Sequence, residues 1–172
     1  IFKRAGAKNV VAVKSDSGMM GGSISHEFML LADIGEDTLA ICPECGYKAN
    51  MEAAELKTIN EPGEKEELKK IHTPDTKTID DLYKFTNIPE TRMCKAVVYQ
   101  KNLTDEYVIV FIRGDLDVNE TKLRNYLGEE VHAALITEES GIVAGFIGAV
   151  NLKAKAQIIF DASLKGIERL VC

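Results

Sequence analysis

The sequence has no tryptophan, no stretch rich in proline and serine, and no apolar run near the roughly 20 residues that cross a bilayer. These absences argue against a membrane partner and against a low-complexity tail. Positive charge is also scarce, since 21 Lys and Arg face 27 Asp and Glu, for a net charge of −6. Broad nucleic-acid binding through clustered basic residues is therefore not expected, whereas local contact with an RNA end is compatible with this charge.

Several catalytic motifs are absent as well. The glycines at positions 18, 21 and 22 are not followed by the Lys and Ser or Thr of a phosphate-binding loop, and no GxSxG or HExxH sequence occurs. Nucleophilic serine or cysteine catalysis is therefore not expected. The glycines suit tight turns or a close backbone approach.

The chain has four cysteines, Cys42, Cys45, Cys94 and Cys172, without the spacing of a disulfide framework, and it shows no secretory leader. We therefore expect reduced thiols and a cytoplasmic location. Cys42 and Cys45 lie in CPECG, one half of a zinc knuckle, but a structural zinc site needs four ligands and no second half follows. The motif is either a tight turn, the remainder of a metal site or part of a zinc-ribbon interaction module, and we assign no metal ligand.

What is present is an alternation of strand and helix patterns in two parts, 1–50 and 71–172, separated by an acidic linker at 51–70. Residues 48–57 are helix-prone, and the first part otherwise predicts an antiparallel sheet. Because the chain begins at Ile1 and ends within an apolar pattern, we expect a piece of a longer protein. The patterns predict strands at 9–14, 26–33, 38–42, 93–100, 106–113, 131–137, part of 142–152 and 156–160, and helices at 79–86 and 119–127.

Local signals mark the ends of the two helices. Thr78 to Asp81 resembles a capping box with Asp in place of Glu, and Gly128 is the expected stop of the second helix. In that second helix, helical spacing predicts that Leu123, Tyr126 and Leu127 face inward.

Lys95 is the charged residue that stands out, because it shares one face of its strand with apolar residues. Such a lysine either reaches solvent at a sheet edge or is held in a pocket by an anionic partner. Arg113 and Asp115, at the end of the next strand, are expected to pair with each other and to terminate that strand.

Four further residues admit either a structural or a functional interpretation. Asp161, just past the last strand, either caps the following turn or projects into a site. Thr73 precedes Pro74 and is either an entry residue of the domain or part of a pocket. Gly145 and Gly148 either bend the chain or form a substrate-binding loop. The residues alone predict a cytoplasmic α/β chain with a pocket near Lys95.

Two groups of motifs resemble bacterial-type prolyl-tRNA synthetases. DSGMMGGSISHEFMLLADIGED followed by CPECGYKANMEAAE resembles the region after class II motif 2, and HTPDTKTIDDL, RGDLDVNETKL and GFIGAVNL resemble the editing domain inserted into that catalytic fold. The motifs occur in the family's order and cover nearly the whole chain. The resemblance implies an α/β (α+β) fold, with a mixed, largely antiparallel, curled sheet and a few helices over 71–172. It implies a small antiparallel fragment of a class II core over 1–50.

The same resemblance implies an editing site that hydrolyses alanine mischarged onto tRNA for proline. The family's pocket lysine falls on Lys95 and its aspartate beyond the glycine loop on Asp161, and these two are expected to be catalytic. The threonine of the TP entry motif falls on Thr73, which is expected to bind substrate.

The substrate-binding loop of the family, GxxxP, falls on Gly145 to Ala149 and includes Gly148. Alanine stands here in place of proline, so we expect a less rigid loop. A pocket histidine that the family carries in a later G-K-H segment has no counterpart before Cys172, so we expect the chain by itself to be an incomplete editing site.

The implied partners are the acceptor end of tRNA(Pro) with alanine as the mischarged group, and no cofactor is expected for editing. The parent enzyme is expected to be a homodimer that joins proline to tRNA(Pro) with ATP and Mg²⁺. This chain lacks motifs 1 and 3 and the motif 2 arginines, so it is not expected to charge tRNA alone. The alternative is a non-catalytic module that binds the tRNA end or another protein.

Overall fold

The computed structural model describes residues 1–18, 21–22 and 24–172, so Met19, Met20 and Ser23 of the expected glycine-rich turn lie outside the described residues. The chain divides into two compact units, the first formed by Ile1–Lys57 with Asn119–Gly128 and the second by Thr58–Val118 with Glu129–Cys172. The domain boundaries expected from sequence stay a prediction.

The first unit is built on a four-stranded sheet in the order β2-β1-β4-β3. Its strands are β1 (Val10–Ser15), β2 (Ser25–Leu30), β3 (Leu39–Ile41) and β4 (Lys48–Asn50). The β1–β2 and β3–β4 pairs are antiparallel, whereas β1 and β4 pair in parallel. The sheet is therefore mixed but mostly antiparallel, in agreement with the antiparallel fragment expected for this part of the chain.

Residues 48–57, which are helix-prone by sequence, do not form a helix. Residues 48–50 form β4, because pairing with β1 and β3 outweighs a modest helix propensity. One helical turn follows: Asn50 accepts hydrogen bonds from Ala53 N at its side-chain oxygen (2.9 Å) and from Ala54 N at its carbonyl (2.9 Å).

Helix α2 (Glu120–Leu127) groups with the first unit and has the predicted ends. Asn119 accepts from Lys122 N at the N-terminus, and Gly128 ends the helix in the left-handed region at φ 70°. Asp16 holds the helix through Arg124 Nη2 at 2.7 Å and Asn125 Nδ2 at 2.6 Å. Leu123 is buried as expected, but the inward position of Tyr126 is wrong, because its side chain is 72% exposed.

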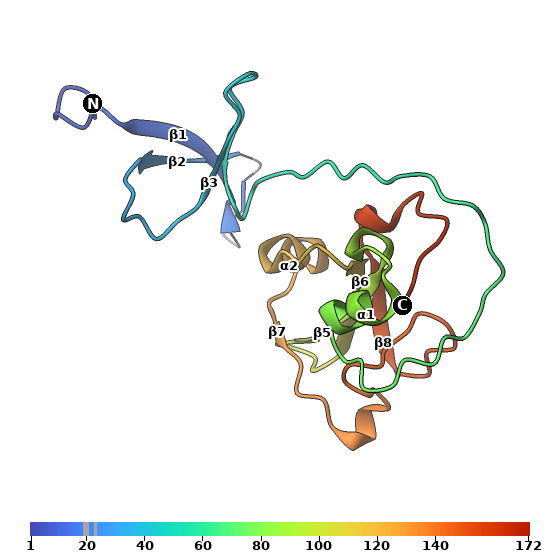
Figure 1. Cartoon of the computed structure of the whole chain (residues 1–172). Coiled ribbons are helices and arrows are strands. Elements are labelled where there is room, and N and C mark those ends of the chain that lie inside the picture. The colour runs from blue at the N-terminus through green and yellow to red at the C-terminus, as the bar shows by residue number, and fades with distance from the viewer. Residues whose placement is uncertain (19–20, 23) are drawn as a thin grey trace. The chain divides into compact units, whose positions relative to one another are not determined.

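The second unit contains a four-stranded sheet in the order β7-β5-β6-β8 (Figure 1). Its strands are β5 (Cys94–Lys101), β6 (Tyr107–Arg113), β7 (Val131–Ala133) and β8 (Ala156–Phe160). β5 pairs antiparallel with β6 and β7, and β6 pairs in parallel with β8. The expected mixed, mostly antiparallel α/β architecture is confirmed.

Strand β6 forms the centre of the second unit, because every residue from Val108 to Arg113 is buried. One face of the sheet packs around a cluster of Cys94, Ile109, Phe111 and Ile142. The opposite face carries Val108, Val110 and Ile112, which are also buried. Burial on both faces explains why β6 is a continuous apolar run in sequence.

Helix α1 (Ile79–Thr86) begins at the predicted capping box, in which Thr78 accepts from Asp81 N and Asp81 accepts from Thr78 N.

Two strand predictions in this unit need correction. The strand expected at 131–137 is shortened to β7, and 142–152 forms turns instead of a strand. Gly145 has φ 80°, a left-handed conformation that interrupts an extended chain. The short 3₁₀ helices are η2 (Glu90–Arg92), η3 (Glu138–Ser140) and η4 (Ala162–Leu164).

Within the described part of the chain, neither the length nor the apolar character of any helix suffices to cross a membrane.

Gly114, after β6, sits where no side chain fits. A Cβ atom there would lie 2.8 Å from Glu90 O and 2.9 Å from Met93 Cβ, and its amide donates to Met93 O at 2.7 Å. Glycine is thus required at this position by close packing rather than by an unusual φ angle.

We predict that Gly114→Ala lowers the free energy of unfolding of the second unit by about 1–3 kcal/mol, because backbone atoms must move to admit the methyl group. Urea-induced unfolding followed by circular dichroism measures the change. Gly148→Ala is the matched control, since a Cβ there meets nothing within 4 Å, and it should change stability by less than about 1 kcal/mol. Equal effects of the two substitutions would contradict the packing explanation.

Candidate functional site

Lys95 lies on β5 opposite Ile112 of β6, and its side chain is 25% exposed. Its ammonium group donates to Asp117 Oδ1 at 2.8 Å, while the Asp117 side chain is 96% exposed. Lys95 therefore has the anionic partner that one of the two interpretations required. An ion pair with so exposed a carboxylate contributes at most about 1 kcal/mol, so an incoming anion could replace Asp117 at little cost.

Asp161 follows β8 and serves as the N-cap of η4. Its backbone N–H donates to Phe111 O at 2.8 Å, and its Oδ1 accepts from Ser163 N at 2.8 Å. The capping interpretation of Asp161 is thus observed. Among the hydrogen bonds of the described residues, this is the one that the Asp161 carboxylate accepts, which leaves its second oxygen open to another donor.

The strand register brings Lys95 and Asp161 to the same end of β6. Lys95 pairs with Ile112, and Phe160 pairs with Phe111. If the parallel pairing of β8 with β6 is extended by one residue, Asp161 lies beside Ile112. The two residues flank β6 from opposite sides, two strand spacings or about 10 Å apart at their backbones. Paired positions share a face of the sheet, so both residues belong to the face of Ile112.

The other predicted residues are not joined to Lys95. Gly145 is exposed, and Gly148 is half-buried. The apolar residue Ile147 between them packs against the Cys94 cluster, on the sheet face opposite to Lys95. Thr73 is half-buried, and its carbonyl accepts from Thr76 Oγ1 at 2.7 Å. In the described structure, hydrogen bonds and ion pairs connect Lys95 to Asp117 rather than to any of these residues.

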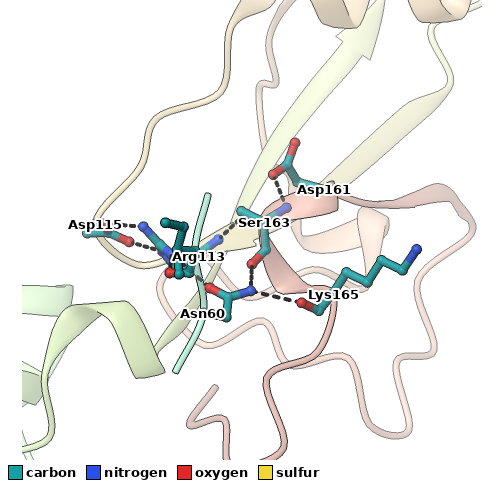
Figure 2. Close-up of polar contacts among 7 residues, drawn as sticks. Asn60, Arg113, Asp115, Asp161, Ser163 and Lys165 are labelled. Atoms are coloured by element: carbon teal, nitrogen blue, oxygen red, sulfur yellow. Dashed lines mark hydrogen bonds and ion pairs between the residues drawn. The ribbon is translucent and has the colours of Figure 1, made fainter. Parts of the chain in front are cut away.

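A polar cluster around the buried residues Arg113 and Ser163 lies at the end of β6 (Figure 2). Arg113 is 8% exposed, and its guanidinium donates from Nε and Nη2 to Asp115 at 2.6 and 2.8 Å. The expected pairing of Arg113 with Asp115 is therefore observed. A third bond runs from Arg113 Nη1 to Asn60 Oδ1 at 2.8 Å, and Asn60 Nδ2 donates to Ser163 O at 2.7 Å. The cluster borders a cavity of about 120 Å³.

Sequence reasoning missed Asn60 and Ser163. It assigned Asn60 to an exposed linker and Ser163 to a turn, because their partners lie 53 and 103 residues away from Asn60 in the chain. The available signal was Arg113 itself, a permanent charge at the end of a strand that is otherwise apolar. Such an arginine requires more acceptors than one carboxylate provides.

Cys94 and Cys172 lie side by side where Met93 bridges to Val171 in parallel. The hydrogen bond between the two sulfurs, together with burial, raises the pKa of Cys94 above its ordinary value. The same bond, helped by the N–H of Ala149, lowers the pKa of Cys172 to about 7. Cys172 is exposed and thus a reactive thiol.

The CPECG motif forms a turn in which Cys45 N donates to Cys42 Sγ at 3.5 Å. This backbone donor lowers the pKa of Cys42. No group of three or more His, Cys, Asp or Glu side chains suited to a metal ion occurs among the residues placed by the structure.

Comparison with known proteins relates the chain to one family. Residues 73–172 match the family model described as an aminoacyl-tRNA editing domain. The chain is 43% identical, over 97% of its length, to a proline–tRNA ligase of Brachyspira hyodysenteriae, and 40% identical, over 95%, to that of Aquifex aeolicus. It spans 30% and 29% of the length of these relatives. A crystal structure titled hypothetical protein APE2540 overlaps 52% of this chain and 61% of that one, at 22% identity and a TM-score of 0.46.

We predict that alkylation of Cys172 by iodoacetamide follows pH with a midpoint near 7. Cys94→Ala removes the thiol donor and should move the midpoint toward the ordinary value of about 8.5. Cys94→Ser is the matched control, because its hydroxyl still donates and should keep the midpoint low. Mass spectrometry of the peptide that contains Cys172 gives the rates, and an unchanged midpoint in Cys94→Ala would rule out the hydrogen bond as the cause.

Proposed function

The chain belongs to the aminoacyl-tRNA editing domain family, and on that basis we propose that its second unit hydrolyses the ester of alanine mischarged onto tRNA(Pro). The observation that supports this reaction is the arrangement of Lys95 and Asp161 at one end of β6, on the same face of the sheet. An ammonium group and a carboxylate carried by backbones about 10 Å apart can bind the two ends of a small aminoacyl ester.

The parent protein is then a proline–tRNA ligase of the cytoplasm, of which this chain supplies the editing region. Identities of 38–43% to proline–tRNA ligases over 95–100% of the chain support this proposal. The parent would join proline to tRNA(Pro) with ATP and Mg²⁺, as a homodimer. We assign no residue of this chain to Mg²⁺, because the described residues contain no cluster of three acidic, His or Cys ligands.

Selection against alanine follows from size. A synthetic site that accepts proline cannot strongly reject the smaller alanine, because each missing methylene changes binding by only about 1–3 kcal/mol. A second, smaller pocket can admit alanine and exclude the proline ring, which is a double-sieve arrangement. Thr73, Gly145 and Gly148 stay the predicted lining residues of this pocket, although Ile147, between the two glycines, packs on the sheet face opposite to Lys95.

In hydrolysis, water attacks the ester carbonyl carbon, and the bond to the terminal ribose oxygen breaks to release alanine. Lys95 would leave Asp117 and place its ammonium group beside the developing oxyanion or the terminal phosphate. Asp161 would use its open carboxylate oxygen either to accept a hydrogen bond from the alanyl ammonium or to orient the attacking water.

The second candidate function is a non-catalytic module that binds the tRNA end or a protein. The ion pair of Lys95 with Asp117 favours it, because a neutralised lysine gives no fixed positive charge until a ligand displaces the carboxylate. Deacylation assays with Ala-tRNA(Pro) and Pro-tRNA(Pro), on this chain and on the longer ligase, separate the two functions. Binding of the tRNA without release of alanine in either protein would exclude the catalytic proposal.

We predict that Lys95→Ala lowers the rate of Ala-tRNA(Pro) deacylation by at least about 100-fold, as expected when a charge that stabilises the transition state is removed. The fold should persist, because Lys95 is partly exposed and its partner is exposed. Lys101→Ala is the matched control, because Lys101 lies on the same strand and pairs with Glu106 at 3.0 Å. The Lys101→Ala protein should deacylate Ala-tRNA(Pro) at the wild-type rate. A Lys95→Ala protein with normal activity would disprove the role of Lys95.

A further inference from the structure

Asp161 needs a fixed direction if it is to hold the aminoacyl group, and its direction depends on η4. Its Oδ1 accepts the backbone N–H of Ser163, so the carboxylate moves with that residue. A three-residue 3₁₀ helix has few internal hydrogen bonds and cannot hold its own position. Phe111 O holds the backbone N–H of Asp161, but the direction of the Asp161 carboxylate must come from the groups that surround η4.

Ser163 is the buried residue through which η4 is held, with 2% exposure. Its hydroxyl accepts from the backbone N–H of Arg113 at 3.3 Å. Its carbonyl accepts from Asn60 Nδ2 at 2.7 Å, and the same Asn60 nitrogen donates to Lys165 O at 2.9 Å. Carbonyls at the end of a helix lack internal donors, and the amide of Asn60 supplies both of these (Figure 2).

The orientation of Asn60 is set by Arg113. The Arg113 Nη1 donor points at Asn60 Oδ1 at 2.8 Å, so the amide oxygen faces the guanidinium and the NH₂ faces the two carbonyls. The reverse orientation would set donor against donor and acceptor against acceptor. Arg113 is itself held by Asp115 through two bonds, so each member of the network has one possible arrangement.

Residues next to Asn60 in the linker also contact the second unit. Arg92 Nη2 donates to Pro62 O at 3.2 Å, and a Cβ atom on Gly63 would lie 2.7 Å from Arg92 Nη1. Neighbouring linker residues are exposed, as Ile59 shows at 83%. Asn60 therefore is not carried inward by a buried apolar segment. Its own hydrogen bonds, and those of Pro62, hold this stretch of chain against the second unit.

We propose that Asn60 is a positioning residue for Asp161 and acts through Ser163 and Arg113. Residues 58–63 of the linker then belong to the editing site. This inference rests on the proposed function for the role of Asp161. It extends the functional unit beyond the residues that match the editing-domain family model, which begin at residue 73.

The test is Asn60→Asp in the complete chain, because this isosteric change keeps the acceptor for Arg113 and removes both donors to η4. We expect kcat for Ala-tRNA(Pro) hydrolysis to fall roughly 10-fold to 100-fold, as for a misplaced catalytic group, with KM changed less than about threefold. Asn87→Asp is the matched control: it makes the same change at an exposed residue of the same unit and should keep the wild-type kcat. Rates are compared at a temperature at which circular dichroism shows all proteins folded.

A second measurement, amide hydrogen exchange at Ser163 by NMR, does not depend on activity. Asn60→Asp should speed exchange of the Ser163 amide by at least about tenfold, since that amide is the donor to Asp161. Normal kcat in Asn60→Asp, where the wild type is active, overturns the inference. If neither the wild-type chain nor the longer wild-type ligase deacylates Ala-tRNA(Pro), the proposed function fails. In that case an unchanged amide exchange rate of Ser163 in Asn60→Asp would still overturn the positioning role of Asn60, independently of any activity.

Discussion

The burial of strand β6 on both faces is the constraint on which the second unit depends. Every residue from Val108 to Arg113 is buried, so each backbone N–H and C=O in this stretch must find a protein partner. β5 provides these partners on one side and β8 on the other. The same hydrogen-bond ladders set the strand registers, and these registers place Lys95 and Asp161 beside the end of β6. A slip of one residue would send either side chain to the opposite face of the sheet.

A second constraint arises where β6 ends, because its last residue is a buried arginine. Removing a guanidinium from water is costly unless charged and polar acceptors surround it. Asp115 supplies the charge, and the Asn60 side chain and the Ile59 carbonyl supply further acceptors, the last at 3.4 Å. Linker residues therefore lie against the second unit, where they accept hydrogen bonds from the Arg113 guanidinium. Through Ser163, the same network orders the segment that carries Asp161. Core packing and the geometry of the candidate site share this one network.

Features with local causes could be predicted from sequence. The capping box at Thr78 and the stop at Gly128 each depend on a few adjacent residues, and both helices appear where these signals place them. Features that depend on distant partners could not. Residues 48–50 have helical preference but become β4 through pairing with β1 and β3. Residues 142–152 look like a strand by composition. Three of their apolar residues, Ile142, Ile147 and Leu152, pack on the Cys94 cluster from a turning chain instead.

The sequence by itself determined the α/β class, the continuous apolar β6, the residue types of the candidate site and, through its motifs, the family. Each of these depends on composition, on short-range periodicity or on the identity of the residues. Only the tertiary structure decided that Lys95 and Asp161 flank one strand end, and that Asn60 joins Arg113 to Ser163. Such relations depend on strand register and on hydrogen bonds that span 50 to 103 residues. No local pattern encodes them, because the partners become neighbours only after the sheet has formed.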